Sequence, residues 1–201
     1  MNKKSGFTLT EVMITMGVIG VISALTVPTL LNNYQRKALS LQLRKTVNDF
    51  TSAADLMMTE EGKARFSATT GYNNLDNFIT GHFKVLKTCA ANNSGCFAAE
   101  NYRSINGESS AAFSCAGNSY ILASSAAVCL SSSDDGNVIV TTDTNGPEGP
   151  NIAGRDLFMF ALRGDDGTAD FVGTVANCVT STTGTGCYEL LASENNWVME
   201  Y

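Results

Sequence analysis

One long uncharged segment near the start of the chain restricts what this sequence can fold into. The 20 residues from Val12 to Leu31 carry no charge, and Glu11 is the only charged residue between Lys4 and Arg36. An α-helix of about this length can cross a bilayer core of ~30 Å. Because a carboxylate is costly in lipid unless it finds a partner, Glu11 is a candidate functional residue. The segment therefore predicts a membrane helix with a functional charge at its head.

The residues around this head follow a specific pattern. The letters KKSG at residues 3–6 are followed by FTLTE at residues 7–11, which opens the apolar run. This string resembles the N-terminus of type IV prepilins and type II secretion pseudopilins, in which a short basic leader ends in Gly and is followed by Phe-Thr-Leu-x-Glu and an apolar helix. The resemblance implies that a prepilin peptidase cuts between Gly6 and Phe7 and methylates the new amino group of Phe7.

The same resemblance assigns roles to two further residues. Glu11 is the fifth residue after the implied cut, where the family places its assembly glutamate, and Pro28 lies where many pilins carry a helix-kinking proline. An ordinary secretory signal peptide is the main alternative, but it needs an apolar stretch of only ~7–15 residues and a small-x-small cleavage site. A plain signal anchor would need neither Gly6-Phe7 nor Glu11.

The helical pattern continues beyond the membrane segment. Apolar residues recur at steps of three and four, which places them on one face of an amphipathic helix: Leu39, Leu43, Val47, Phe50, Ala54 and Met57. We expect one helix from about Thr8 to Glu61, with Gly62 as its stop. Pro28 should kink it or remove one of its hydrogen bonds.

Beyond Gly71 the sequence changes to short apolar runs separated by turn residues. The runs that predict strands lie at residues 83–86, 120–122, 138–141, 157–162 and 171–172. Strands that follow one another without intervening helices predict an antiparallel sheet. We therefore expect an α+β fold, in which a small antiparallel β-sheet domain packs on the distal half of a long pilin-like helix. Residues 196–201 resemble the closing strand of pseudopilin-like proteins.

This pattern divides the chain into four parts. We expect a leader peptide at residues 1–6, a transmembrane or fibre-core helix segment at 7–31, an amphipathic distal helix at 32–61, and a disulfide-containing globular β domain at 62–201. The globular part is long enough for one small core.

All six cysteines lie beyond residue 88, outside the predicted helix. An even number in the part of the chain outside the membrane favours disulfides formed in an oxidising compartment. A zinc site is disfavoured, because no Cys-x-x-Cys spacing occurs and His82 is the only histidine. We favour nearest-neighbour pairing, since each pair encloses a loop-like sequence. The pairs are Cys89 with Cys96, Cys115 with Cys129, and Cys178 with Cys187.

The densest turn signal runs from Asp143 to Asp156 with the sequence DTNGPEGPNIAGRD. It is similar to a stretch of some pseudopilin-like proteins, and major pseudopilins bind calcium in a distal loop. Asp143, Asn145 and Asp156 are the candidate calcium ligands, because Ca²⁺ prefers hard oxygen donors. The spacing does not fit an EF-hand, since Thr141 and Ile152 occupy ligand positions. The alternative, which we favour, is a structural turn capped by the Asp and Asn side chains. No other cofactor is expected.

The distribution of charge excludes some partners. Residues 1–65 hold eight Lys or Arg against five Asp or Glu, whereas residues 66–201 hold five against fourteen. So acidic a distal domain disfavours nucleic acid as a partner.

No Gly-x-Ser-x-Gly, phosphate-loop or dinucleotide fingerprint occurs, and His82 has no arranged nucleophile. The sequence therefore does not predict an enzyme.

Together these features predict a structural subunit of a type IV pilus or a type II secretion pseudopilus. The resemblance implies a single pass through the cytoplasmic membrane, with the globular domain outside, followed by assembly with copies of itself or with other pilins on an inner-membrane platform. Lys3 and Lys4 favour this orientation, whereas Arg36 and Lys37 oppose it. The alternative is an adhesive or ligand-binding module displayed on a prepilin-type anchor, which a basic or aromatic-rich exposed patch would favour.

Overall fold

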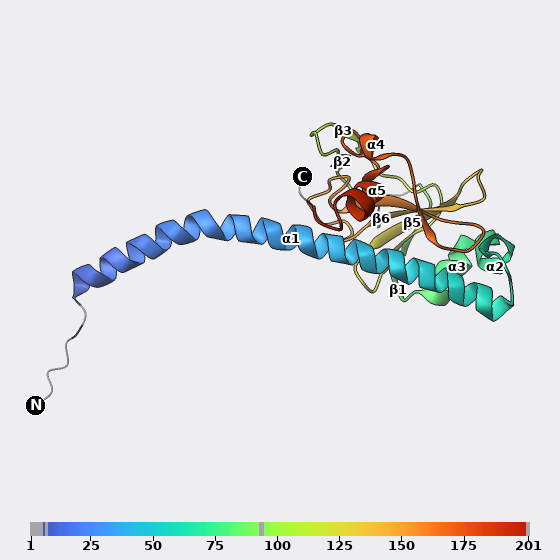
Figure 1. The fold of residues 1–201 in the computed structure, drawn as a ribbon, viewed down its shortest axis with the longest axis horizontal. Coiled ribbons are helices and arrows are strands. Elements are labelled where there is room, and N and C mark those ends of the chain that lie inside the picture. The colour runs from blue at the N-terminus through green and yellow to red at the C-terminus, as the bar shows by residue number, and fades with distance from the viewer. Residues whose placement is uncertain (1–5, 7, 93–94, 200–201) are drawn as a thin grey trace, which may run out of the picture. The chain divides into compact units, whose positions relative to one another are not determined.

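The computed structural model describes residue 6, residues 8–92 and residues 95–199 of the 201-residue chain (Figure 1). The chain divides into two compact units, residues 1–37 and residues 38–201. Helix α1 (Leu9–Glu61) supplies the described helical residues of the first unit and the first residues of the second. Its bounds agree with the helix expected from the sequence.

In the first unit, α1 exposes its large apolar side chains. Leu9 is 78% exposed, Met16 70% and Leu25 73%. Its threonines bond within the helix: the hydroxyl of Thr15 donates to the carbonyl of Val12, and that of Thr26 donates to the carbonyl of Ile22. α1 is the only helix in the described part of the chain that is long and apolar enough to cross a membrane. This part of α1 therefore lacks the cover that a water-soluble helix would need.

In the second unit, the same helix buries the face that the periodicity predicts. All six residues of the predicted stripe are buried, and Leu43 and Phe50 are completely inaccessible. The Phe50 ring lies 4.5 Å from the ring of Phe83 and 5.9 Å from that of Phe160, measured between centroids. Phe160 belongs to the sheet, so Phe50 joins helix and sheet in one core.

Six antiparallel strands form the main sheet, in the order β1-β4-β5-β6-β7-β8. They are β1 (Val85–Cys89), β4 (Ser119–Leu122), β5 (Ala127–Ser132), β6 (Val138–Asp143), β7 (Leu157–Leu162) and β8 (Ala169–Phe171). β2 (Asn101–Arg103) and β3 (Ser109–Ala112) form a separate hairpin. Figure 1 shows the distal part of α1 running along the sheet of the second unit. The α+β fold predicted from the sequence is confirmed.

β5 was not predicted, because it lacks the alternation of a half-buried strand. Val128 and Leu130 pack into the core under α1, whereas Ala127 and Cys129 belong to a second apolar cluster with the buried Tyr102. Since both faces of β5 are covered, the strand is apolar at consecutive positions. Such a run cannot be assigned from a period of two.

The chain also forms short helices that the sequence did not predict. They are η1 (Phe66–Ala68), α2 (Thr70–Asn73), α3 (Leu75–His82), α4 (Val175–Cys178), α5 (Cys187–Glu189) and the π-helix η2 (Leu190–Glu194). Helices therefore also form beyond Gly71, where only strands separated by turns were expected, so that expectation is wrong. Side-chain caps begin α2 and α3: the hydroxyl of Thr69 accepts from the backbone N–H of Tyr72, and the side-chain oxygen of Asn74 accepts from that of Asn77.

The expectation of a closing strand near the C-terminus is also wrong for its described residues. Asn196 and Trp197 adopt positive φ angles of 45° and 66°, which no strand permits. The hydroxyl of Ser40 on α1 donates to the carbonyl of Trp197 at 2.6 Å. The guanidinium of Arg44 lies 5.6 Å from the centroid of the Trp197 ring. These contacts with α1 replace strand pairing; residues 200 and 201 lie outside the described part.

Candidate functional site

The first turn of α1 is closed by three reciprocal hydrogen bonds between Thr8 and Glu11. The backbone N–H of Thr8 donates to Oε2 of Glu11 at 2.8 Å, and the Thr8 hydroxyl donates to the same oxygen at 2.9 Å. In return, the backbone N–H of Glu11 donates to the Thr8 hydroxyl at 3.3 Å. This is a capping box, which satisfies backbone groups that a helix start leaves unpaired.

The capping box leaves half of the carboxylate unused. Among the described residues, Oε1 of Glu11 has no hydrogen-bond partner, while Oε2 accepts both bonds from Thr8. The side chain is thus held at the N-terminal end of α1 with one oxygen available to a cation. The sequence signal was present, because Thr8-Leu9-Thr10-Glu11 fits the pattern of a capping box, but the sequence analysis did not use it.

The other predicted residues of this site are placed as follows. Gly6 is exposed, and nothing lies within 4 Å of the position that a Cβ atom would take there. Phe7, the expected site of cleavage and methylation, lies outside the described residues. Pro28 lies inside α1, which continues through it. Because proline has no N–H, the carbonyl of Ala24 loses its usual helical partner there. The kink itself stays a prediction.

Comparison with known proteins identifies the same segment. Residues 1–27 match the model of a family described as the prokaryotic N-terminal methylation motif. This chain carries that motif. The prepilin peptidase-dependent protein D of Escherichia coli (strain K12) is 37% identical to it over 62 residues, which are 31% of this chain and 42% of that protein. No solved structure matches the chain significantly.

These matches confirm the resemblance of the chain to prepilins and pseudopilins. The methylation motif covers the basic leader, Gly6, Phe7 and Glu11. The aligned region spans less than half the length of the Escherichia coli relative. The similarity therefore concerns a short part of the chain, and the fold of the distal unit comes from the structure alone.

The cysteines form three disulfides between sequence neighbours. The bonds join Cys89 to Cys96, Cys115 to Cys129, and Cys178 to Cys187, and the described residues include no free cysteine. These are the nearest-neighbour pairs that the sequence analysis favoured. The first two bonds lie in the apolar cluster around Tyr102, and the third lies in the main core. All three therefore stabilise the distal unit.

In the turn between β6 and β7, the Asp and Asn side chains bond to neighbouring groups. The carboxylate of Asp156 accepts from the backbone N–H groups of Asn151 at 2.6 Å, Ile152 at 2.8 Å and Leu157 at 3.0 Å. The side-chain N–H₂ of Asn145 donates to the carbonyls of Glu148 and Gly149, each at 2.9 Å. These bonds match the capped structural turn that the sequence analysis preferred.

Asp143 occupies a buried position at the start of the same turn. Its carboxylate accepts from the Tyr102 hydroxyl and from the backbone N–H of Asn145. Burial raises the pKa of Asp143 to about 8, and the neighbouring carboxylate of Asp156 adds to the rise. Burial likewise raises the pKa of Asp156 to about 6, although the backbone N–H groups that bond to it oppose the rise. Asp143 is therefore largely protonated at neutral pH.

The donor set of this turn is a poor fit for calcium. Asp143 and Asp156 already accept internal hydrogen bonds, and Asp143 would have to lose a proton to bind a cation. In the described part of the chain, no three His, Cys, Asp or Glu side chains gather where they could hold a metal ion. The side-chain oxygens of Asn145 and Asn151 are buried and have no hydrogen-bond partner in the described part of the chain. The structural turn therefore stays the preferred prediction for this segment, and calcium binding by Asp143, Asn145 and Asp156 stays the alternative.

Proposed function

We propose that this chain is a non-enzymatic structural subunit, processed by a prepilin peptidase and polymerised through its N-terminal helix into a type IV pilus or a type II secretion pseudopilus. One combination supports this proposal most strongly: a methylation motif over residues 1–27 overlaps the uncharged helical segment at residues 12–31, whose apolar side chains are exposed in the single chain. Such a helix requires lipid or other apolar helices around it. The Escherichia coli relative is named as a prepilin peptidase-dependent protein, which favours the same dependence for this chain.

In this proposal the four parts of the chain act in sequence. The leader, residues 1–6, is removed in the cytoplasm, and residues 7–31 hold the subunit in the cytoplasmic membrane. Residues 32–61 and 62–201 lie outside, where the oxidising compartment allows the three disulfides to form. An assembly platform in the inner membrane then stacks the processed subunits, so that contacts between apolar helices replace their contacts with lipid.

We propose that Glu11 pairs with a cation in the fibre, which the geometry of the capping box supports. In a core of apolar helices an ionised carboxylate must be paired, because an isolated charge at low dielectric is very costly. The amino group of Phe7 from an adjacent subunit is a suitable cation, since it is exposed by cleavage and stays charged after methylation. Oε1 of Glu11 can accept from this amine while Oε2 keeps its bonds to Thr8. This pair would fix the axial position of one helix against the next.

Processing is tested by producing the full chain with and without its prepilin peptidase. We expect the chain to be shortened at Gly6-Phe7 only when the peptidase is present, and only the shortened form to appear in fibres sheared from the cells. A Gly6→Leu variant should remain uncut and in the membrane. A mature N-terminus downstream of Ala24 would contradict the proposal, because it would indicate an ordinary signal peptide.

A further inference from the structure

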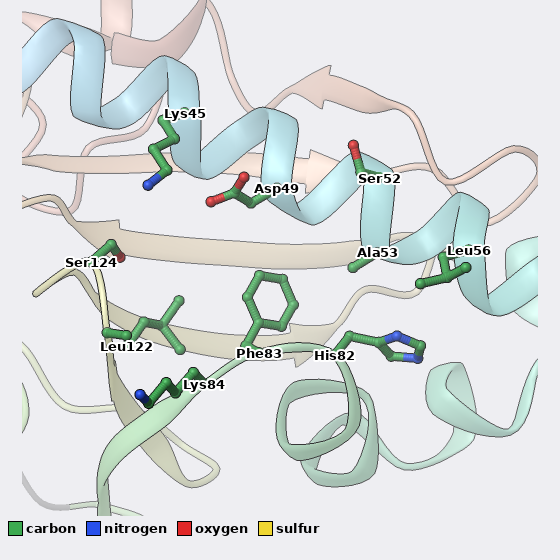
Figure 2. Close-up of a pocket in the computed structure, with 11 residues that line it drawn as sticks. Lys45, Asp49, Ser52, Ala53, Leu56, His82, Phe83, Lys84, Leu122 and Ser124 are labelled. Carbon is green, nitrogen blue, oxygen red and sulfur yellow. The ribbon is translucent and has the colours of Figure 1, made fainter.

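An open groove in the second unit combines an apolar floor with positive charge. Its volume is about 460 Å³, and it lies between α1, the segment that leads into β1 and the turn that follows β4 (Figure 2). Phe83 and Leu122 lie at its base, and Lys45 of α1 and Lys84 border it from opposite sides. We call this feature the lysine groove.

The two lysines of the groove are available to an anionic partner. In the described part of the chain neither Lys45 nor Lys84 forms a salt bridge, and both side chains are exposed. Asp49, which also lines the groove, offsets one of these charges. Residues 38–201 hold nine Lys or Arg and eighteen Asp or Glu, a balance of −9. The groove thus carries one net positive charge on a unit whose overall charge is negative.

A complementary feature lies at β8. Phe171 is a large apolar side chain that is 43% exposed, and its ring contacts Tyr188 at 5.3 Å between centroids. Asp170 precedes it and forms no salt bridge in the described part of the chain. Its Oδ1 accepts from the backbone N–H of Phe171 at 2.8 Å, and its charge also acts on Arg163. Asp165 and Asp166 lie in the adjoining turn, where Arg163 pairs with them. This edge of the sheet thus presents an exposed aromatic ring beside excess negative charge.

We propose that the lysine groove of one subunit receives the β8 edge of a second copy of this chain, with Phe171 over the apolar floor and Asp170 facing Lys84. This inference rests on the proposed function, because it describes a contact between subunits in the fibre. The match is twofold: an exposed ring meets an apolar floor, and a carboxylate meets an ammonium group, neither of which forms a salt bridge in the described part of a single chain. Complementary charge of this kind orients subunits and excludes wrong pairings.

The topology of the sheet makes this contact suitable for a polymer. The groove lies beside β1 and β4, at one edge of the sheet, whereas β8 forms the opposite edge. One subunit can therefore use its groove and its β8 edge at the same time, each with a different neighbour. A contact between two different surfaces is heterologous, and when its rotation does not close a ring it produces an open filament.

Charge reversal in the full chain tests the contact. Lys84→Glu and Asp170→Lys should each lower the yield of sheared fibres by about tenfold or more relative to processed subunit in membranes, because each places like charges opposite one another. The double variant restores the opposite charges and should recover most of the yield. Lys63→Glu and Glu108→Lys, which reverse exposed charges elsewhere in the second unit, serve as matched controls and should leave the yield unchanged.

Cross-linking supplies a readout that does not depend on fibre yield. Cells that produce a Ser124→Cys variant together with a Thr168→Cys variant should form a covalent dimer on mild oxidation, whereas either variant alone should not. Single reversals without effect, a double variant that is no better than the singles, or no dimer would overturn the inference. A cross-link to a chain of different mass would do so too, since the occupant would not be a second copy.

The two proposals fail in different ways. If wild-type cells make fibres that Glu11→Ala abolishes, yet the reversals and cross-links give nothing, only the groove contact is refuted. If this chain enters no fibre and Glu11→Ala does not change the fibre yield, the proposed function fails. The cross-linked dimer of the two cysteine variants in membranes then tests the groove contact without any fibre.

Discussion

Replacing Glu11 by glutamine keeps the helix cap and removes only the charge. Glutamine can accept from Thr8 as glutamate does, because the capping box tolerates either residue at this position. Glu11→Ala removes cap and charge together, and Thr8→Ala removes the side-chain part of the cap while leaving the carboxylate. The three variants therefore separate a structural role of Glu11 from a role in pairing with the amine of Phe7.

The expected magnitudes differ enough to be measured. Loss of an N-terminal cap costs about 0.5–2 kcal/mol, which corresponds to roughly a 2- to 30-fold effect on an assembly equilibrium. Leaving one member of a buried ion pair without its partner costs about 3–5 kcal/mol, which corresponds to roughly a hundredfold or larger effect. We therefore expect Glu11→Gln to be nearly as defective in assembly as Glu11→Ala, and Thr8→Ala to be much milder.

The assay is the yield of sheared fibres divided by the amount of cleaved subunit in membranes, with no wild-type subunit present. Cleavage should be normal in all three variants, because the leader and the distal unit are unchanged. If Glu11→Gln assembles like the wild type while Thr8→Ala does not, the carboxylate acts through the cap and the proposed charge pair is wrong. Normal yield from Glu11→Ala would remove the assembly role altogether, provided that this chain is the main component of the fibre.

Three further predictions concern the distal unit. Peptide mapping without reduction should find three disulfides between neighbouring cysteines, and native protein that can be labelled with a thiol reagent would contradict this pairing. Replacing Cys115 and Cys129 by serine should lower the free energy of unfolding by about 3 kcal/mol, since their 14-residue separation closes a medium-sized loop. The folded-state pKa values of Asp143 and Asp156, about 8 and about 6, lie above the unfolded value, so the folded state retains protons that the unfolded state loses. These two groups should therefore contribute most to the free energy of unfolding below about pH 4, and their contribution should be lost as the pH rises through 6 and 8. The Tm of the full chain in detergent, measured against pH, tests this. Asp143→Asn should flatten this fall, and an unchanged slope would show that Asp143 is ionised in the folded state. Calcium or a chelator should leave the Tm unchanged at neutral pH, because the carboxylates of the turn already accept internal hydrogen bonds; a rise of several degrees with calcium, absent in Asp143→Asn, would establish the metal site instead.

Local sequence patterns predicted the parts of the fold that depend on one strong periodicity. The stripe from Leu39 to Met57 predicted the buried face of α1, and the apolar run at residues 157–162 predicted β7 with its observed bounds. The run at residues 83–86 was shifted, because β1 begins at Val85, and Phe83 packs against Phe50 instead. The stripe of α1 could be predicted because it presents one face to a single core, and β7 because its six residues form a continuous apolar run, which is buried on both faces of the sheet.

Tertiary contacts decided the parts that were missed. β5 is covered on both faces and so carries no alternation, and α3 is a short helix whose ring of Phe78 packs against Phe66 at 5.3 Å between centroids. Trp197 was expected in a strand, but its backbone adopts a left-handed conformation and its ring lies beside Arg44 of α1. The contacts of such segments join residues far apart in the chain, and no local pattern encodes them.

The candidate site also has features that a local sequence pattern predicts and features that only tertiary contacts create. The match of residues 1–27 to the methylation motif could be expected from the sequence, because a membrane helix with a charge at its head is a strong local signal. The roles of Gly6, Phe7 and Glu11 within it stay predictions. The partnership of Thr8 with Glu11 is also local and was available from the spacing. In contrast, Tyr102 and Asp143 are far apart in the sequence, and only the fold brings the hydroxyl to the carboxylate.

The central claim is that this chain is cleaved after Gly6 and polymerised through the helix that cleavage frees. Its most direct test is intact-mass analysis of fibres sheared from cells that produce the full chain with its own peptidase and assembly platform. The account predicts a fibre subunit that begins at Phe7, carries one additional methyl group on its N-terminus and contains three disulfides. Fibres that lack this chain in cells whose membranes hold the processed form, or a fibre subunit with another N-terminus, would contradict it.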